Sequence, residues 1–253
     1  MEAQHTILPI GAARCLALSC SICADLSAGA KQELSRLARI RTYSAGETVL
    51  AESEEIRFVG NVVSGVLRMQ KTLHDGRQQI VGLLLPSDVL GRVFSQTSHV
   101  AIEAATDVTL CSYNRASFQA LFARFPELEH RMLMAISHEL DAAQDWMLLL
   151  ATQTVTERIA TFLLILRKKS AASARACGPS FVEVPISRRD MAAYLGTTVE
   201  SISRSVQQMA RSGVIRIVDP QHFEIADPQR LVFLSGHDVE EFDLQASRPR
   251  RFA

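Results

Sequence analysis

The stretch SRRDMAAYLGTTVESISRSVQQMARSG, residues 187–213, decides how this chain folds, because it predicts two short helices joined by a tight turn. Ser187 is a favoured helix cap, and Asp190 follows it at the spacing of a capping box. Gly196 supplies the turn, since glycine adopts positive φ without a Cβ penalty. Thr197 is expected to cap the second helix, whose apolar residues recur at helical spacing. This arrangement is typical of a helix-turn-helix, which lays its second helix in the major groove of DNA.

The outer face of that second helix carries side chains that can contact base edges. Arg204 can donate two hydrogen bonds to guanine, Glu200 can accept one from cytosine, and Ser203 can contact thymine. Arginines at the start of the first helix are candidates for phosphate contacts, although solvated arginines are an equal alternative. The predicted DNA-binding residues are Glu200, Ser203, Arg204, Arg188, Arg189, Thr198 and Gln207. The competing interpretation is a helical hairpin of an ordinary core with a solvated outer face.

The segment after the two helices predicts a short β-hairpin. Residues 214–219 (VIRIVD) and 222–227 (HFEIAD) alternate apolar and polar side chains around a turn at Pro220. A hairpin in this place is a wing, which usually follows the phosphate backbone of DNA.

The net charge of the whole chain does not indicate a DNA-binding protein, but the net charges of its two parts do. The 253 residues are 47% apolar and carry 27 basic and 27 acidic side chains, so the net charge is zero. Residues 1–153 hold 13 Lys and Arg against 16 Asp and Glu, or −3, whereas residues 154–253 hold 14 against 11, or +3. The basic excess therefore accompanies the helix-turn-helix. No apolar run approaches the roughly 18 residues of a membrane span. Residues 16–23 faintly resemble a secretory signal, but the start Met-Glu lacks a basic region and Arg14 interrupts the apolar stretch, so we expect a cytoplasmic protein.

Residues 126–153 predict one long helix, because they contain no Gly and no Pro after Pro126. It would be about 40 Å long at 1.5 Å per residue. Apolar side chains along it alternate by three and four, as in the seam of a two-stranded coiled coil. The predicted dimer interface comprises Leu133, Ile136, Leu140, Ala143, Met147 and Leu150. We expect a homodimer; the alternative is a helix packed on its own domain.

Between about Arg41 and Tyr113 the apolar residues recur with period two. Turn sequences fall at Ala45-Gly46, Ser64-Gly65 and Asp75-Gly76. Many short strands with regular turns predict one β domain, either a sandwich or a barrel.

Five cysteines suggest how such a protein could sense a signal. Cys15, Cys20 and Cys23 have the spacing C-x4-C-x2-C, and Cys111 lies alone in the last predicted strand. Clustered cysteines with a distant fourth are typical of iron–sulfur sites, although thiolates also suit zinc. Ordinary or redox-active thiols are a third interpretation, while a structural disulfide is not expected without secretion. Cys177, in a loop flanked by Gly and Pro, is expected to be a bystander.

The order of these parts resembles the cyclic-AMP receptor protein and fumarate-nitrate-reduction regulator (CRP/FNR) family over nearly the whole chain. The most specific pieces are DGRQQIVGLLLPSDVLG (75–91), ELDAAQDWMLLL (139–150) and LGTTVESISR (195–204). The resemblance implies an α+β fold with an N-terminal β-roll like a cyclic-nucleotide-binding jelly roll, a long dimerisation helix and a C-terminal winged helix-turn-helix. The implied domains are a cysteine-rich arm (1–30), the β-roll (31–125), the dimerisation helix (126–153), the DNA-binding domain (154–236) and a disordered tail (237–253).

The oxygen-responsive branch of that family has a Glu-x-x-Ser-Arg motif in its recognition helix, which Glu200, Ser203 and Arg204 match. The resemblance implies palindromic DNA sites with TTGAT-like half-sites, control of anaerobic or microaerobic genes, and contact with RNA polymerase. It also implies an oxygen-labile [4Fe–4S] cluster held by metal ligands Cys15, Cys20, Cys23 and Cys111. The spacing departs from the C-x2-C-x5-C of the branch, which leaves open a shifted ligand or a cluster of different stability.

Other functions are less well supported by the residues. Cyclic-nucleotide binders of this family use a Gly-Glu pair and an Arg-Ser or Arg-Thr pair, but here Ser87-Asp88 stands at the first and residues 85–106 lack the second. Because a phosphate would lack its bidentate partner, no cyclic nucleotide is expected. The chain shows no phosphate loop, GxSxG or HExxH, so we do not expect an enzyme. A cluster-free regulator responding to thiol chemistry, zinc, haem or another effector remains an alternative. So does an iron–sulfur electron-transfer protein, which would need no recognition helix.

Overall fold

The computed structural model describes residues 7–9, 22–23, 26–171 and 180–236, and it divides the chain into two compact units. The first unit is residues 1–143 and the second is residues 144–253. The expected Cys15, Cys20 and Cys177 lie outside the described residues, as does the predicted tail at 237–253.

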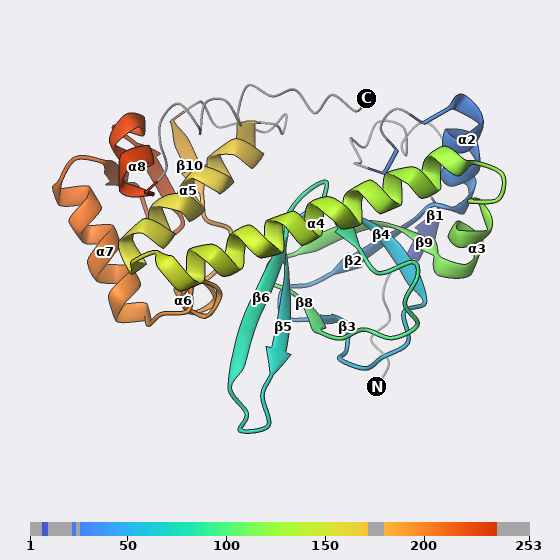
Figure 1. The fold of residues 1–253 in the computed structure, drawn as a ribbon, viewed down its shortest axis with the longest axis horizontal. Helices are drawn as coiled ribbons and strands as arrows, with labels where there is room; N and C mark the ends of the chain where they lie inside the picture. Colours follow the sequence, from blue (N-terminus) through green and yellow to red (C-terminus); the bar gives the residue numbers. More distant parts are fainter. Residues whose placement is uncertain (1–6, 10–21, 24–25, 172–179, 237–253) are drawn as a thin grey trace. The chain divides into compact units, whose positions relative to one another are not determined.

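The described residues of the first unit form two antiparallel sheets (Figure 1). One has the strand order β1-β2-β9-β4-β7, and the other has the order β3-β8-β5-β6. The strands of the first sheet are β1 (Ile7–Pro9), β2 (Arg39–Tyr43), β9 (Val108–Asn114), β4 (Phe58–Ser64) and β7 (Val89–Leu90). Those of the second are β3 (Thr48–Leu50), β8 (Ala101–Ala104), β5 (Leu67–Thr72) and β6 (Gln78–Leu84). The period-two pattern therefore predicted the β domain correctly.

Strand β9 pairs with β2 along one edge and with β4 along the other, and side chains on both of its faces are buried. Leu110 belongs to the core between the two sheets, which also includes Val62 and Ile102. Its neighbour Cys111 points to a second core, which is shared with the helices of this unit. Successive side chains of a strand point to opposite faces, so one strand contributes to both cores.

The helices of the first unit cover that second core. They are α2 (Ala28–Leu37), α3 (Arg115–Ala120) and the first part of α4 (Pro126–Thr152). Ser27 caps α2 by accepting a hydrogen bond from the Ala30 N–H at 3.3 Å. Helix α4 is the predicted long helix; its 27 residues pass from the first unit into the second. Neither α2 nor α3 was anticipated from the sequence.

The second unit contains the predicted winged helix-turn-helix. Its described elements are α5 (Val155–Ala171), β10 (Phe181–Glu183), α6 (Arg188–Leu195), α7 (Val199–Arg211), β11 (Ile215–Ile217), β12 (His222–Ile225) and α8 (Pro228–Leu234). The predicted hairpin is β11 paired antiparallel with β12. Strand β10 adds a third strand on the other edge of β12, which local sequence did not indicate. The α+β architecture expected from the sequence is thus confirmed.

We predict that Gly60→Ala destabilises the first unit, because a Cβ at this position would collide with the carbonyl oxygen of Cys111 on the paired strand. Overpacking of this kind typically costs about 1–3 kcal/mol of unfolding free energy. Gly29→Ala is the control, since its Cβ would lie 3.5 Å from the Phe125 ring, an ordinary contact. Denaturant unfolding of both variants checks the prediction, which fails if the two are equally stable.

Candidate DNA-binding surface and cysteine site

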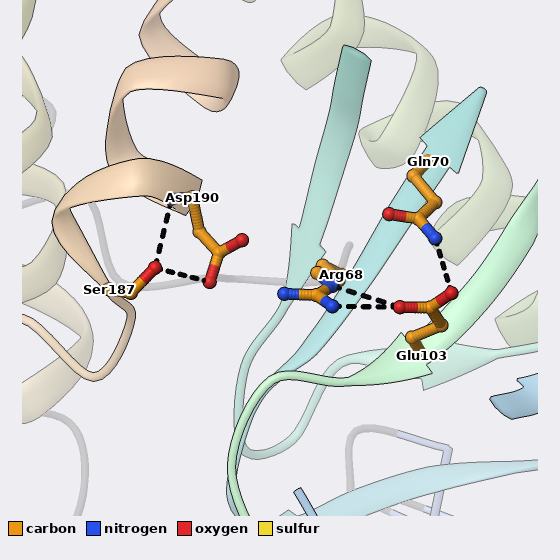
Figure 2. Close-up of polar contacts among 5 residues, drawn as sticks. All are labelled: Arg68, Gln70, Glu103, Ser187 and Asp190. Carbon is orange, nitrogen blue, oxygen red and sulfur yellow. Dashed lines mark hydrogen bonds and ion pairs between the residues drawn. The ribbon is translucent and has the colours of Figure 1, made fainter. Parts of the chain in front are cut away.

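Helix α6 begins with the cap that its sequence predicts. The Ser187 hydroxyl accepts a hydrogen bond from the Asp190 N–H at 3.0 Å and donates to the Asp190 carboxylate at 2.8 Å (Figure 2). The carboxylate thus holds the serine hydroxyl in place. Gly196 ends the helix in the left-handed conformation, with φ of 62°. Residues Met191, Ala192 and Leu195 are buried, as the apolar spacing indicated.

The cap of the second helix, α7, is Thr198, so the expectation of Thr197 was wrong. The Thr198 hydroxyl oxygen accepts a hydrogen bond from the Ser201 N–H at 3.2 Å. The Thr197 N–H instead bonds to the Ala192 carbonyl and closes the turn after α6. Because Thr197 belongs to the turn after α6, the cap of α7 falls one residue later than predicted.

Helix α7 has one buried face and one exposed face. Ile202, Val206 and Met209 are buried at helical spacing. The predicted base-contacting side chains are all exposed on the other side; they are Glu200, Ser203, Arg204 and Gln207. Their position on one exposed helix face is the geometry that a major-groove contact requires.

The charge of Glu200 is stabilised locally. Its carboxylate accepts a hydrogen bond from its own backbone N–H and one from the Thr198 side chain, and these hold the pKa below its ordinary value. These hydrogen bonds favour the charged form of the carboxylate, which is the form that accepts hydrogen bonds.

The two predicted phosphate contacts at the start of α6 differ in environment. Arg189 is exposed, whereas Arg188 is half-buried with its guanidinium 5.1 Å from the ring centre of Phe223 on the wing. Desolvation lowers the pKa of Arg188 from its ordinary value. Arg188 thus packs against the wing, while Arg189 is open to solvent.

Two of the four predicted cysteine ligands lie in the described residues, and both contact the same side chain. The Cys111 thiol is 3.4 Å from the Tyr113 hydroxyl oxygen, and the Cys23 sulfur is 3.7 Å from it. Cys111 and Tyr113 are each only 1% exposed, and Cys23 packs against the same core. Sulfur atoms from the N-terminal arm and from β9 therefore converge on one phenol.

This pair has the donor chemistry of a soft-metal site but is incomplete by itself. Among the described residues, no three His, Cys, Asp or Glu side chains group closely enough to hold a metal ion. Further ligands would have to come from outside those residues, where Cys15 and Cys20 lie. Thiolates favour iron–sulfur clusters, zinc or copper(I) over the hard cations magnesium and calcium.

The predicted dimer seam is largely uncovered in the single chain. Leu133, Leu140 and Met147 of α4 are 52%, 58% and 61% exposed, and Ile136 and Ala143 are exposed as well. Leu150 differs, because it is half-buried beside Gly196 in the second unit. Exposed apolar side chains in this number are typical of a surface that binds a partner.

In the second sheet of the β domain, Arg68 forms an ion pair with Glu103 on the neighbouring strand. Arg68 on β5 donates two hydrogen bonds to Glu103 on β8, at 2.8 and 3.2 Å, and Gln70 donates to the same carboxylate (Figure 2). Asp88, at the Ser87-Asp88 pair, accepts the N–H of Leu85 within its own turn. Both charged groups thus have partners inside the protein.

Comparison with known families identifies both parts of the chain. The family model for the Crp-like helix-turn-helix domain matches residues 157–234, and the model for the cyclic nucleotide-binding domain matches residues 40–125. The transcriptional activator protein FnrL of Cereibacter sphaeroides is 37% identical over 222 residues, which are 87% of this chain and 90% of that protein. The chain belongs to the CRP/FNR family of transcriptional regulators. It is a DNA-binding regulator of the FNR and FixK type, and its relatives are regulators and not enzymes.

Further relatives agree with this assignment. The nitrogen fixation regulation protein FixK of Bradyrhizobium diazoefficiens is 35% identical over 88% of this chain and 92% of that protein. The structure of FixK2 from Bradyrhizobium japonicum matches with a TM-score of 0.73 and 32% identity, over 80% of this chain and 99% of that one. Members of this family act on DNA, usually as dimers. No helix in the described part of the chain is long and apolar enough to cross a membrane.

The sequence did not draw attention to Tyr113 and Arg158. Tyr113 stands two residues after Cys111 on a strand, and residues i and i+2 share a face, so its position beside the thiol could have been inferred. Arg158 had no such indication, because the groups that it contacts come from separate segments.

We predict that Thr198→Ala lowers the unfolding free energy of the second unit by about 1 kcal/mol, the usual cost of losing a helix cap. It should also raise the pKa of Glu200, because that carboxylate loses the hydrogen bond from Thr198. Thr197→Ala should change neither. Thermal unfolding and an NMR titration of Glu200 test both effects; equal behaviour of the two variants would contradict the assignment of the cap.

Proposed function

We propose that this protein is an oxygen-responsive regulator that binds palindromic DNA with TTGAT-like half-sites as a dimer when a [4Fe–4S] cluster is held by Cys15, Cys20, Cys23 and Cys111. Its genes are those of anaerobic or microaerobic growth. When bound, the cluster supplies an oxygen-labile link between the N-terminal arm and the β domain.

One observation carries this proposal: Cys23 and Cys111, far apart in the sequence, both reach the Tyr113 hydroxyl. Cys111 and Tyr113 share a face of β9, so the informative contact is that of Cys23, which brings a thiol of the N-terminal arm to the same buried phenol. A buried site lined by apolar side chains also limits the access of solvent to a cluster, and burial is one of the factors that tune such groups.

The cysteine site is physically connected to the start of the dimerisation helix. Leu128 and Met132 of α4 lie in the same apolar core as Cys111, and both are fully buried. Ser27, shortly after Cys23, donates a hydrogen bond to Glu127 in the first turn of α4 at 2.8 Å. A structural change in the N-terminal arm would therefore alter the hydrogen bond and the apolar contacts that position the first turns of α4.

Dimerisation explains how such a change would control DNA binding. A dimer places two recognition helices on two half-sites, which a monomer cannot do. The exposed seam of α4 supplies an apolar surface for pairing, and loss of the cluster would weaken this pairing without altering Arg204.

We predict that Arg204→Ala removes the preference for guanine at one position of each half-site, a loss of about 1–3 kcal/mol of discrimination for each contact. Fluorescence anisotropy with matched and single-base-changed palindromes measures it. Arg211→Ala is the control, because it removes an equal charge from the exposed end of the same helix. That variant should bind all sequences somewhat more weakly with unchanged preference. If both variants lose affinity uniformly, Arg204 does not contact a base.

We predict that Cys111→Ser purified without oxygen loses iron, sulfide and the visible absorption of the wild type, and binds the palindrome no better than air-treated wild type. Tyr113→Phe tests the neighbouring phenol: it should leave the iron content near normal and speed the loss of absorption in air. The control is Cys177→Ser, which lies outside the proposed ligand set and should match the wild type. A colourless, zinc-containing wild type, or a Cys111→Ser protein with full DNA binding, would overturn the cluster.

A further inference from the structure

The guanidinium of Arg158, in the first turn of α5, bonds to two helix ends at once. It donates to the carbonyl of Leu150 at 2.8 Å and to that of Gln153 at 3.0 Å, at the end of α4. It also donates to the carbonyl of Leu195 at 2.9 Å and lies 3.5 Å from that of Gly196, at the turn of the helix-turn-helix.

An arginine suits this position for two physical reasons. The last carbonyls of a helix lack partners within the helix and carry the negative end of its dipole, so a cation is favoured there. The guanidinium is planar and has several N–H groups in fixed directions, whereas a lysine ammonium is a compact point charge. One arginine can therefore bond to the carbonyls of two helix ends in a defined geometry. A lysine would keep the positive charge but could not make all of these hydrogen bonds.

Aromatic packing joins the same two helices a second time. The rings of Trp146 on α4 and Tyr194 on α6 are stacked, with centres 4.1 Å apart and planes 14° apart. Phe162 of α5 meets Tyr194 edge-on at 5.6 Å. The indole N–H of Trp146 is buried and has no acceptor among the described residues, so this ring is held by packing alone. Trp146 is also the single tryptophan of the chain, which makes its fluorescence a direct report on this contact.

We propose that Arg158 is a positioning residue for DNA binding: it fixes the turn at Leu195–Gly196, and so the start of α7, on the last turn of α4. In a dimer paired through α4, this would hold the two recognition helices at the separation of a palindrome. The inference rests on the proposed dimeric binding. Arg158 itself need not touch DNA.

The test compares the full-length variants Arg158→Gln and Arg158→Lys with the matched control Arg230→Gln. Arg230 also donates to a carbonyl at a helix end, that of Ser212 after α7, but it does not join α4 to α6. Affinities are measured for a TTGAT palindrome and for the same DNA with one half-site scrambled. We expect Arg158→Gln to lower the ratio of the two affinities by roughly tenfold, or about 1.4 kcal/mol, because the turn at Leu195–Gly196 loses its charge-assisted hydrogen bonds to the guanidinium. Arg158→Lys should recover part of the ratio, and Arg230→Gln should keep it.

The emission of Trp146 separates positioning from a general loss of stability. Arg158→Gln should shift the emission to longer wavelength and increase quenching by acrylamide, at a temperature where circular dichroism shows a folded protein. If Arg158→Gln does not fold, Arg158→Lys carries the test. Unchanged emission together with an unchanged affinity ratio overturns the inference. If the wild type itself prefers no palindrome, the proposed function fails, whereas the response of Trp146 still decides whether Arg158 orders this junction.

Discussion

The carbonyl groups at the ends of α4 and α6 are the constraint on which the second unit depends. Each helix leaves its last carbonyls without partners in its own backbone, and burying them unsatisfied is costly. Arg158 satisfies both ends with one charge, so the two helices are held where a single guanidinium can reach them. The recognition helix begins only a few residues after this point, and its direction follows from that of the turn.

Strand β9 imposes a comparable constraint on the first unit. It lies between β2 and β4 and is buried on both faces, so alternate side chains serve different cores. Leu110 packs in the core between the two sheets, while Cys111 and Tyr113 pack in the core shared with the helices. The sheet fixes the position of the Cys111 thiol, because the strand that carries it is paired along both edges. Gly60 allows the close approach of β4 to the Cys111 backbone.

The elements that the sequence predicted well are those with a local pattern. The period-two strands and the paired short helices appear as expected, and the long helix predicted over 126–153 is α4, Pro126–Thr152. Strand β10 has three residues and exists because it pairs with β12, far away in the sequence, so local periodicity could not indicate it. Thr197 and Thr198 are equally good caps as residue types, and only the hydrogen bond that closes the turn distinguishes them.

The candidate DNA-binding residues and Arg158 differ in the same way in how far the sequence indicates them. Glu200, Ser203 and Arg204 follow from helical spacing, and their exposure agrees with it. Arg158 does not, because an arginine in an amphipathic helix is most often solvated, and its acceptors belong to two other helices. Helix α4 links the two kinds of site along one uninterrupted backbone: its first turns share a core with Cys111, and its last turn is bound by Arg158. Contacts at both ends of α4 limit fraying there, so under the proposed function a change at its first turns would reach its last turn along the helix.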